Sequence, residues 1–176
     1  MSTLKVGTIQ STAGNTGLTI ANDGTTLPKA CAFFMSPNQN QSIANASEVQ
    51  VTFEVANYDT NSIIDLSNNR VVITTATAGL WFLSFTTRLN SSVPFRHYNI
   101  IKKNGNDLVV YEQANYSQTT GAYQSCTVQG TFNLVNSDAL TFFIYQGQGS
   151  TKNMQNGTNS GNGVEVSASG FRVGTL

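Results

Sequence analysis

The chain has 176 residues, of which 39% are hydrophobic and 10% charged, and Lys plus Arg equals Asp plus Glu at nine each. This length predicts one domain with a sizeable core and room for a tail. The zero net charge argues against a protein that binds nucleic acid through a basic face. Charged residues usually make up about 25% of a soluble domain, and here Asn, Thr, Ser and Gly replace them. Such a polar but uncharged surface is typical of subunits that share faces in an assembly.

Residues 1 to 28 form a lead that is rich in Thr, Gly and Asn and poor in hydrophobic residues. Turn signals at Gly14-Asn15 and Asp23-Gly24 leave only short extended pieces, which are too small to build a core. We therefore expect an extended arm that becomes ordered by docking on another protein. Its candidate attachment residues are apolar: Leu4, Val6 and Ile9.

Strand patterns follow one another from Ala30 onward, separated by polar loops that include 36–47 and 147–163. In 49–56, apolar and polar residues alternate with the period of two that marks a half-buried strand. Asn104-Gly105 is the strongest hairpin signal in the chain. No window has a sustained 3.6-residue apolar period, so we expect an all-β antiparallel sandwich or barrel. The expected strands are 30–35, 49–56, 70–74, 78–89, 98–103, 107–111, 126–134, 140–146 and 164–173.

Some of these strands are apolar on both faces. In the central strand, Leu80 and Phe82 alternate with Trp81, Leu83 and Phe85, and the strands 107–111 and 140–146 have the same two-sided character. An antiparallel sandwich needs only one dry face per strand, so the second apolar face predicts a subunit interface. The candidate interface residues are Phe143, Tyr145, Val109 and Tyr111.

Four short motifs give the body of the chain a family resemblance. Their order is Tyr58-Asp59, Gly79-Leu80-Trp81-Phe82, Asp138-Ala139-Leu140 and Ser169-Gly170-Phe171. This order resembles the Y-D, G-L-Y-x-F, D-x-V and S-x-F pattern of the C1q/TNF-like jelly roll, with Trp81 and Leu140 where that family usually has Tyr and Val. The resemblance covers residues 29 to 176. It implies a ten-stranded, two-sheet antiparallel jelly roll that assembles as a homotrimer.

The segment 3–15 has a second resemblance. Its Leu4-Lys5-Val6 phrase, followed by Ile9, resembles the opening of structural proteins of marine tailed phages, where it precedes a fibre or knob domain. We see no apolar run that reads as a signal peptide or a membrane span, which fits a virion protein assembled in a host cytoplasm. The two resemblances together imply a fibre, knob or decoration protein that other virion proteins hold by the arm 1–28.

Catalysis finds little support in the sequence. No motif places a serine or cysteine nucleophile beside the only histidine, His97, which we expect to be a polar residue at a strand start near the outer surface. Possible glycosidase carboxylates show no diagnostic spacing: Glu54, Asp59, Asp65 and Glu112. We therefore expect a protein that is not an enzyme and needs no cofactor. The alternative functions are a receptor- or glycan-binding lectin-like module for host attachment and, less favoured, a polysaccharide depolymerase.

Each of three further features of the sequence allows two interpretations. Asn57, Asp59 and Asp65 could supply oxygens to calcium, but ordinary turn chemistry explains them better, and we expect no metal site. Cys31 and Cys126 are too few for a zinc site and are expected to be buried as small hydrophobes, while a single bridge between them stays open. The loop 147–163 either contacts a glycan or is simply solvated.

Overall fold

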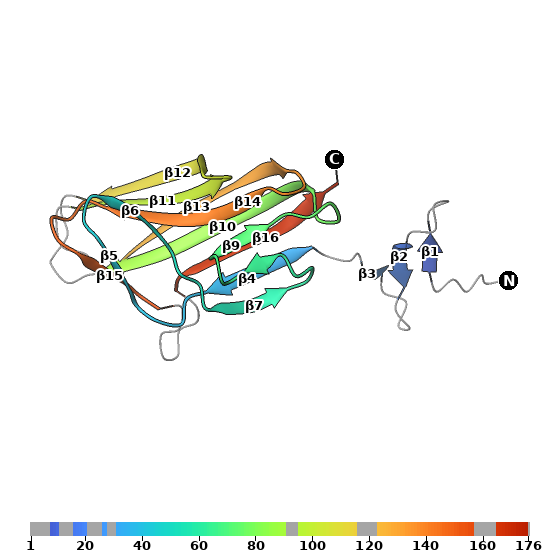
Figure 1. The fold of residues 1–176 in the computed structure, drawn as a ribbon, viewed down its shortest axis with the longest axis horizontal. Helices are drawn as coiled ribbons and strands as arrows, with labels where there is room; N and C mark the ends of the chain where they lie inside the picture. Colours follow the sequence, from blue (N-terminus) through green and yellow to red (C-terminus); the bar gives the residue numbers. More distant parts are fainter. Residues whose placement is uncertain are drawn as a thin grey trace. The chain divides into compact units, whose positions relative to one another are not determined.

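The computed structural model describes residues 8–10, 16–20, 26–27, 31–90, 95–115, 123–156 and 165–175. The chain divides into two compact units, Met1–Cys31 and Ala32–Leu176. The first unit contains a three-stranded antiparallel sheet of β1 (Thr8–Gln10), β2 (Thr16–Ile20) and β3 (Thr26–Leu27) (Figure 1). The short extended pieces expected there therefore pair with one another.

The second unit is a sandwich of two antiparallel sheets, which confirms the predicted fold class (Figure 1). We call them the seven-stranded and the five-stranded sheet. Among the described residues there is no helix, and so none that is long and apolar enough to cross a membrane. The seven-stranded sheet consists of β5 (Gln41–Ile43), β15 (Lys152–Met154), β10 (Gly79–Asn90), β16 (Ser167–Gly174), β4 (Ala32–Ser36) and β7 (Val55–Asp59), with β13 (Tyr123–Leu134) on the other edge of β10. The five-stranded sheet has the order β12 (Asn106–Asn115), β11 (Phe95–Lys103), β14 (Ala139–Gln146), β9 (Arg70–Val72) and β8 (Ile64–Asp65).

The hydrophobic core lies between the two sheets and is rich in aromatic residues. Trp81 and Phe85 on β10 are fully buried, and the Phe85 ring centroid lies 5.3 Å from that of Phe142 on β14 of the opposite sheet. Phe53 completes this cluster, with its ring 6.5 Å from Phe85 and 5.8 Å from Phe142. The Trp81 indole N–H donates to the carbonyl of Thr77 at 2.9 Å, so the one polar atom of this large side chain is satisfied.

One predicted strand is in fact two. The alternating stretch 49–56 contains the end of β6 (Ser47–Gln50), which lies along β14, and the start of β7, which pairs with β4 in the other sheet. Between them the chain crosses from one sheet to the other. There the backbone N–H groups of Thr52 and Phe53 donate to the side chains of Gln41 and Asn69 instead of to a neighbouring strand.

Short strands occur inside segments that the sequence predicts as loops. β5 lies in the expected loop 36–47, β15 lies in the expected loop 147–163, and the two pair with each other. These strands are polar and only three residues long, so they carry no periodic signal. Together with β8 they raise the strand count above the ten that the family resemblance implies.

Candidate functional site

The attachment residues expected in the arm are only partly described. Leu4 and Val6 lie outside the described residues. Ile9 lies in β1, where its backbone pairs with Leu18 of β2. The structure therefore leaves the attachment role of this segment as a prediction.

The four predicted interface residues lie on two different faces of the five-stranded sheet. Residues directly opposite each other on neighbouring strands share a face. Ile100 is opposite Phe143, and Tyr98 is opposite Tyr145, on the face that points away from the sandwich. On the inner face, Ile101 is opposite both Phe142 and Val109, and Asn99 is opposite Tyr111. The structure thus separates Phe143 and Tyr145 from Val109 and Tyr111.

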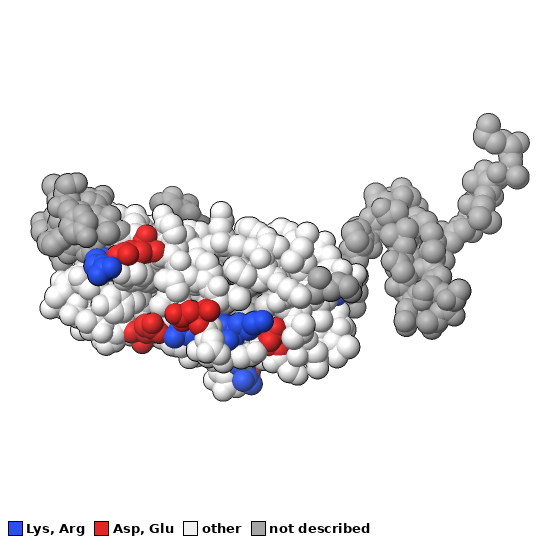
Figure 2. Space-filling view, turned by 90° about the horizontal axis from the view of Figure 1, so that it is seen from above, with Lys and Arg blue, Asp and Glu red and all other residues white. Residues whose placement is uncertain are grey.

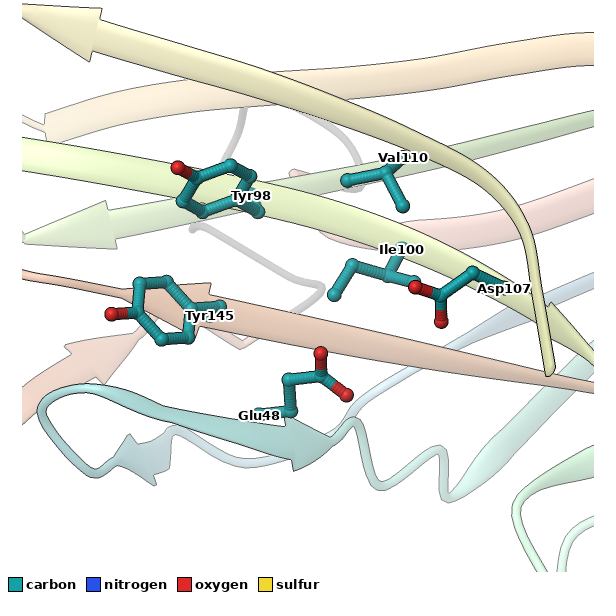
Figure 3. Close-up of a pocket in the computed structure, with 6 residues that line it drawn as sticks. All are labelled: Glu48, Tyr98, Ile100, Asp107, Val110 and Tyr145. Atoms are coloured by element: carbon teal, nitrogen blue, oxygen red, sulfur yellow. The ribbon is translucent and has the colours of Figure 1, made fainter. Parts of the chain in front are cut away.

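A depression of about 310 Å³ lies on the outer face of the five-stranded sheet (Figure 3). We call it the outer pocket. Figure 3 shows two tyrosine rings at one end, Asp107 at the other, Ile100 between them, and Glu48 along the side formed by β6. It is lined by Glu48, Tyr98, Ile100, Asp107, Val110 and Tyr145. Of these residues only Tyr145 is a candidate from the sequence, because the others come together only when β6, β11, β12 and β14 are aligned.

Lys102 joins the two carboxylates of the outer pocket. Its Nζ lies 2.6 Å from Oε2 of Glu48 and 3.4 Å from Oδ1 of Asp107, and it sits 4.8 Å from the centroid of the Phe143 ring. The hydrogen bond to Glu48 is the main cause of a raised pKa at Lys102, so this side chain stays charged. The side chain of Lys102 is only 16% exposed, against 42% for Glu48 and 51% for Asp107. A ligand would therefore meet the carboxylates and not the ammonium group.

The tyrosine end of the pocket is held by an ion pair. The Tyr98 and Tyr145 rings pack edge to face with centroids 5.2 Å apart, and the Arg96 guanidinium lies 5.3 Å from the centroid of Tyr98. Arg96 Nε donates to Glu112 at 2.7 Å, and hydrogen bonds from Arg96 and Tyr98 lower the pKa of Glu112. Figure 2 shows that the few acidic and basic side chains seen from above lie close together on a mostly uncharged surface.

The outer face of the seven-stranded sheet is apolar at one end. Phe82 on β10 and Phe171 on β16 are directly opposite, with ring centroids 5.3 Å apart, and Phe171 is 50% exposed. Phe34 and Tyr58 stack beside them on β4 and β7, with centroids 5.9 Å apart. Val173 is 56% exposed and extends this surface. We call these five residues the aromatic face.

A second hollow opens at the edge where the two sheets meet. Its volume is about 340 Å³, and it lies between β12 and β13. It is lined by Val109, Val110, Tyr111, Thr127, Val128 and Gln129. Two of the predicted interface residues, Val109 and Tyr111, therefore line one open edge of the sandwich.

His97 is completely buried, which corrects the expectation that it lies near the outer surface. It is opposite Gln146 on β14, and its Nε2 lies 2.8 Å from the hydroxyl of Thr87 on β10. Thr87 also lies 2.6 Å from Oδ1 of Asn99, so the three side chains form a polar cluster between the sheets. The expectation rests on the polarity of the histidine side chain, whereas the alternation of residues along β11 places His97 on the inner face.

The hydrogen bonds of this cluster fix the histidine tautomer. Asn99 donates its amide hydrogens to the carbonyls of Phe85 and Cys126, at 3.1 and 2.8 Å, so its Oδ1 must accept the Thr87 proton. The Thr87 oxygen then accepts from His97, which carries its proton on Nε2 and leaves Nδ1 bare, with no hydrogen-bond partner among the described residues. Because Nε2 is protonated and the cluster is closed to substrates, His97 cannot act as a base toward Thr87.

The carboxylates considered for calcium are engaged in turns. Asp59 accepts from the backbone N–H groups of Asn61 and Ile64, at 3.2 and 2.7 Å. Asp65 accepts from Ser67, Asn68 and Arg70, and these hydrogen bonds hold its pKa well below its usual range. Within the described ranges no three metal-ligating side chains cluster.

Both cysteines are buried, as predicted, and no disulfide joins them. Cys126 lies on the inner face of β13, and its sulfur is 3.9 Å from the Tyr111 carbonyl. Burial is the main reason that the pKa of this thiol is raised to about 12. The protonated thiol is therefore a packing residue.

The sequence matches no protein-family model and no curated protein. Three solved structures are similar in fold. The TNF protein Eiger of S. frugiperda has a TM-score of 0.62 and 10% identity, covering 84% of this chain and 94% of that one. Murine APRIL has a TM-score of 0.60 and 16% identity, covering 82% of this chain and 99% of that one. The globular domain of zebrafish complement 1qA has a TM-score of 0.56 and 13% identity, covering 82% of this chain and 98% of that one.

The fold is a C1q/TNF-like jelly roll. The identities are too low to indicate more than the fold. Two motif glycines have a clear structural role in this jelly roll. Gly79 has φ +149°, and a Cβ there would lie 2.2 Å from the carbonyl oxygen of Gly174. A Cβ on Gly170 would lie 2.6 Å from the Phe33 ring, so β16 can pack against the core only with glycine at this position.

The aspartate of the third motif ties two turns of the jelly roll together. Asp138 accepts from the backbone N–H of Val135 at 2.9 Å and from the side chain of Asn104 at 2.8 Å. Asn104 has φ 53° and Gly105 has φ 81°, as the predicted hairpin turn requires. Burial alone would raise the pKa of Asp138, but the hydrogen bonds from Val135 and Asn104 and the nearby Lys103 lower it.

Proposed function

We propose that this protein is a non-enzymatic structural subunit of a tailed-phage virion. Its jelly-roll body forms a homotrimer, and the segment 1–28 holds it on the particle by contacts with other virion proteins. The observation that supports the homotrimer is the aromatic face, an apolar surface on the outside of the seven-stranded sheet. A monomer would leave this surface in water.

The aromatic face is suited to burial against another copy because almost no charge surrounds it. Along the outward-facing positions described for β4, β10, β13 and β16, the one charged residue is Arg88, at the far end of β10. Arg88 pairs with Glu165 and also lies over the Tyr123 ring. No other charge on these positions would have to lose its water when two copies meet.

The hollow between β12 and β13 is the complementary surface that we propose for the neighbouring copy. An interface between two different surfaces of the same chain can close into a ring. Val109 and Tyr111 line this hollow, so their predicted interface role fits this arrangement. Phe143 and Tyr145 face away from it, and their rings already contact Lys102 and Tyr98.

A pair of aspartate variants tests which face assembles. Phe171→Asp puts a charge in the aromatic face, and we expect light scattering to give a monomer mass instead of three subunits. Tyr145→Asp is the matched variant on the outer face of the five-stranded sheet, and we expect it to keep the trimer mass. The opposite pattern would return the interface to Phe143 and Tyr145, and a trimer from both variants would contradict the aromatic-face interface.

The virion context rests on the arm and on the composition. The phrase at Leu4 to Ile9 resembles phage structural proteins, and the low charge is typical of assembled subunits. A chain that lacks residues 1 to 28 should still form trimers but should be missing from particles assembled in its presence. Incorporation of the truncated chain at the level of the full chain would contradict the proposed tether.

A lectin-like role in host attachment is the second candidate. The outer pocket favours it, because it combines tyrosine rings with hydrogen-bond acceptors on the side of the body that the proposed trimer leaves exposed. Three such pockets in one trimer, repeated over a particle, would give avidity to a weak single contact.

A further inference from the structure

We propose that the outer pocket binds one pyranose ring of an uncharged saccharide. This inference deepens the second candidate function and rests on the proposed trimer only in requiring that the outer face stay exposed. It assigns the ligand contacts to β6, β11, β12 and β14 and not to the loop 147–163. The walls of the pocket, its acceptors and its charge support this assignment.

The walls suit the apolar C–H surface of a sugar ring. Tyr98 and Tyr145 supply aromatic carbon at one end, and Ile100 and Val110 supply aliphatic carbon beside it. Ile100 is only 3% exposed and so forms the floor, while Val110 is 44% exposed and forms part of the rim. The volume of about 310 Å³ is at the lower end of small-molecule pockets, which span about 300–1,000 Å³. It is sufficient for one sugar ring.

The carboxylates supply acceptors for hydroxyl groups. Lys102 engages Oε2 of Glu48 and Oδ1 of Asp107, which leaves Oε1 and Oδ2 to accept from a ligand. In Figure 3, Asp107 approaches Ile100 from the end opposite the tyrosines, and Glu48 approaches from the side of β6. A pyranose ring can therefore lie on the apolar floor while its hydroxyl groups donate to both carboxylates.

The charge of the pocket excludes anionic sugars. Two carboxylates face one ammonium group, and the Lys102 side chain that carries it is the least exposed of the three side chains. Sialic or uronic acids would place a further carboxylate beside Glu48 and Asp107, where Lys102 already engages both carboxylates. We therefore expect neutral hexoses to bind and acidic ones to be rejected.

A quaternary ammonium ligand suits this pocket less well than a sugar. Aromatic cages for such cations present open ring faces to the ligand. Here the Arg96 guanidinium already lies over Tyr98, and Tyr145 meets Tyr98 edge to face at 78°. A second cation over the same ring would be repelled by Arg96.

Saturation-transfer NMR on the full chain tests the proposal. The probes are the methyl glycosides of glucose, galactose and mannose, with N-acetylneuraminic acid and choline as the anionic and cationic comparisons. We expect saturation transfer to at least one neutral glycoside and none to the two charged probes. No transfer to any neutral glycoside at millimolar concentration, or equal transfer to either charged probe, would overturn the assignment.

Variants locate the binding. Tyr145→Ala and Glu48→Gln should each reduce the transfer at least about fivefold, because each removes one wall or one acceptor. Their controls are Tyr123→Ala, an exposed tyrosine on β13, and Glu54→Gln, an exposed carboxylate outside the pocket lining. Transfer that persists in both pocket variants, or that is lost equally in the controls, would place the ligand elsewhere and overturn the proposal.

Light scattering on the same samples separates this proposal from the proposed trimer. Sugar binding by a chain of monomer mass would leave the outer pocket standing and remove the trimer. A trimer that binds no sugar would leave the trimer standing and overturn the sugar assignment of the outer pocket.

Discussion

The single histidine of the chain is locked in one protonation state by its neighbours. His97 donates through Nε2 to Thr87, and no residue in the described part of the chain bonds its Nδ1. Adding a proton to Nδ1 would create a buried charge and an unsatisfied donor together. Burial is the main cause of a pKa lowered to about 4, against an ordinary value of 6.5.

This lowered pKa predicts that acid weakens the fold. Between pH 6.5 and about 4 the unfolded chain binds the histidine proton and the folded chain does not, so the free energy of unfolding falls as the pH falls. The full effect of one such group is about 3 kcal/mol. Urea unfolding at several pH values from 7 to 4 should show a smaller loss of stability for His97→Gln than for the parent chain. Equal losses in both would contradict the assigned environment of His97.

Polar side chains, more than strand pairing, determine where several elements begin and end. The crossing between β6 and β7 uses the side chains of Gln41 and Asn69 to satisfy backbone N–H groups, and Asp138 does the same for the turn before β14. These partners are remote in sequence or lie in loops. Alternation therefore predicted most long strands but not this crossing.

The carboxylate of Asp138 should stabilise the two turns that it joins. Asp138→Ala removes the acceptor for the Val135 N–H and for the side chain of Asn104, so we expect a loss of about 1–3 kcal/mol in the free energy of unfolding. Asp107→Ala is the control, because Asp107 is an exposed carboxylate of the neighbouring hairpin, and we expect a change within about 0.5 kcal/mol. Urea unfolding measures both. Similar losses for the two variants would mean that Asp138 does not hold the turns together.

For the molecule as a whole, the sequence indicated that some strands are apolar on both faces but not which face stays outside. Leu80 and Phe82 are as apolar as Trp81 and Phe85, with which they alternate in the sequence. Only the strand order shows that Leu80 and Phe82 lie on the outer face of the seven-stranded sheet. The strand 140–146 posed the same ambiguity. The outer pocket was beyond prediction because its lining comes from four strands whose register the sequence does not specify.

An uncharged interface predicts an assembly that tolerates salt. Ionic strength weakens contacts between exposed charges and leaves apolar contacts intact. We therefore expect the same trimer mass by light scattering at about 0.1 M and 1 M NaCl, where the screening length falls from about 10 Å to 3 Å. Dissociation at high salt would indicate instead that contacts between charged side chains of different subunits hold the trimer together.

The position of β16 has a consequence for synthesis on the ribosome. This last strand lies between β10 and β4, and it pairs with the first strand of the body through Phe171 and Ala32. Until the residues up to Gly174 have been translated, β4 and β10 each present an open edge to other nascent chains. The seven-stranded sheet therefore closes only after translation of the body is complete, and its folding is slow because most of its pairings join distant parts of the chain. A chain that stalls before β16 is the species in which we expect aggregation to start.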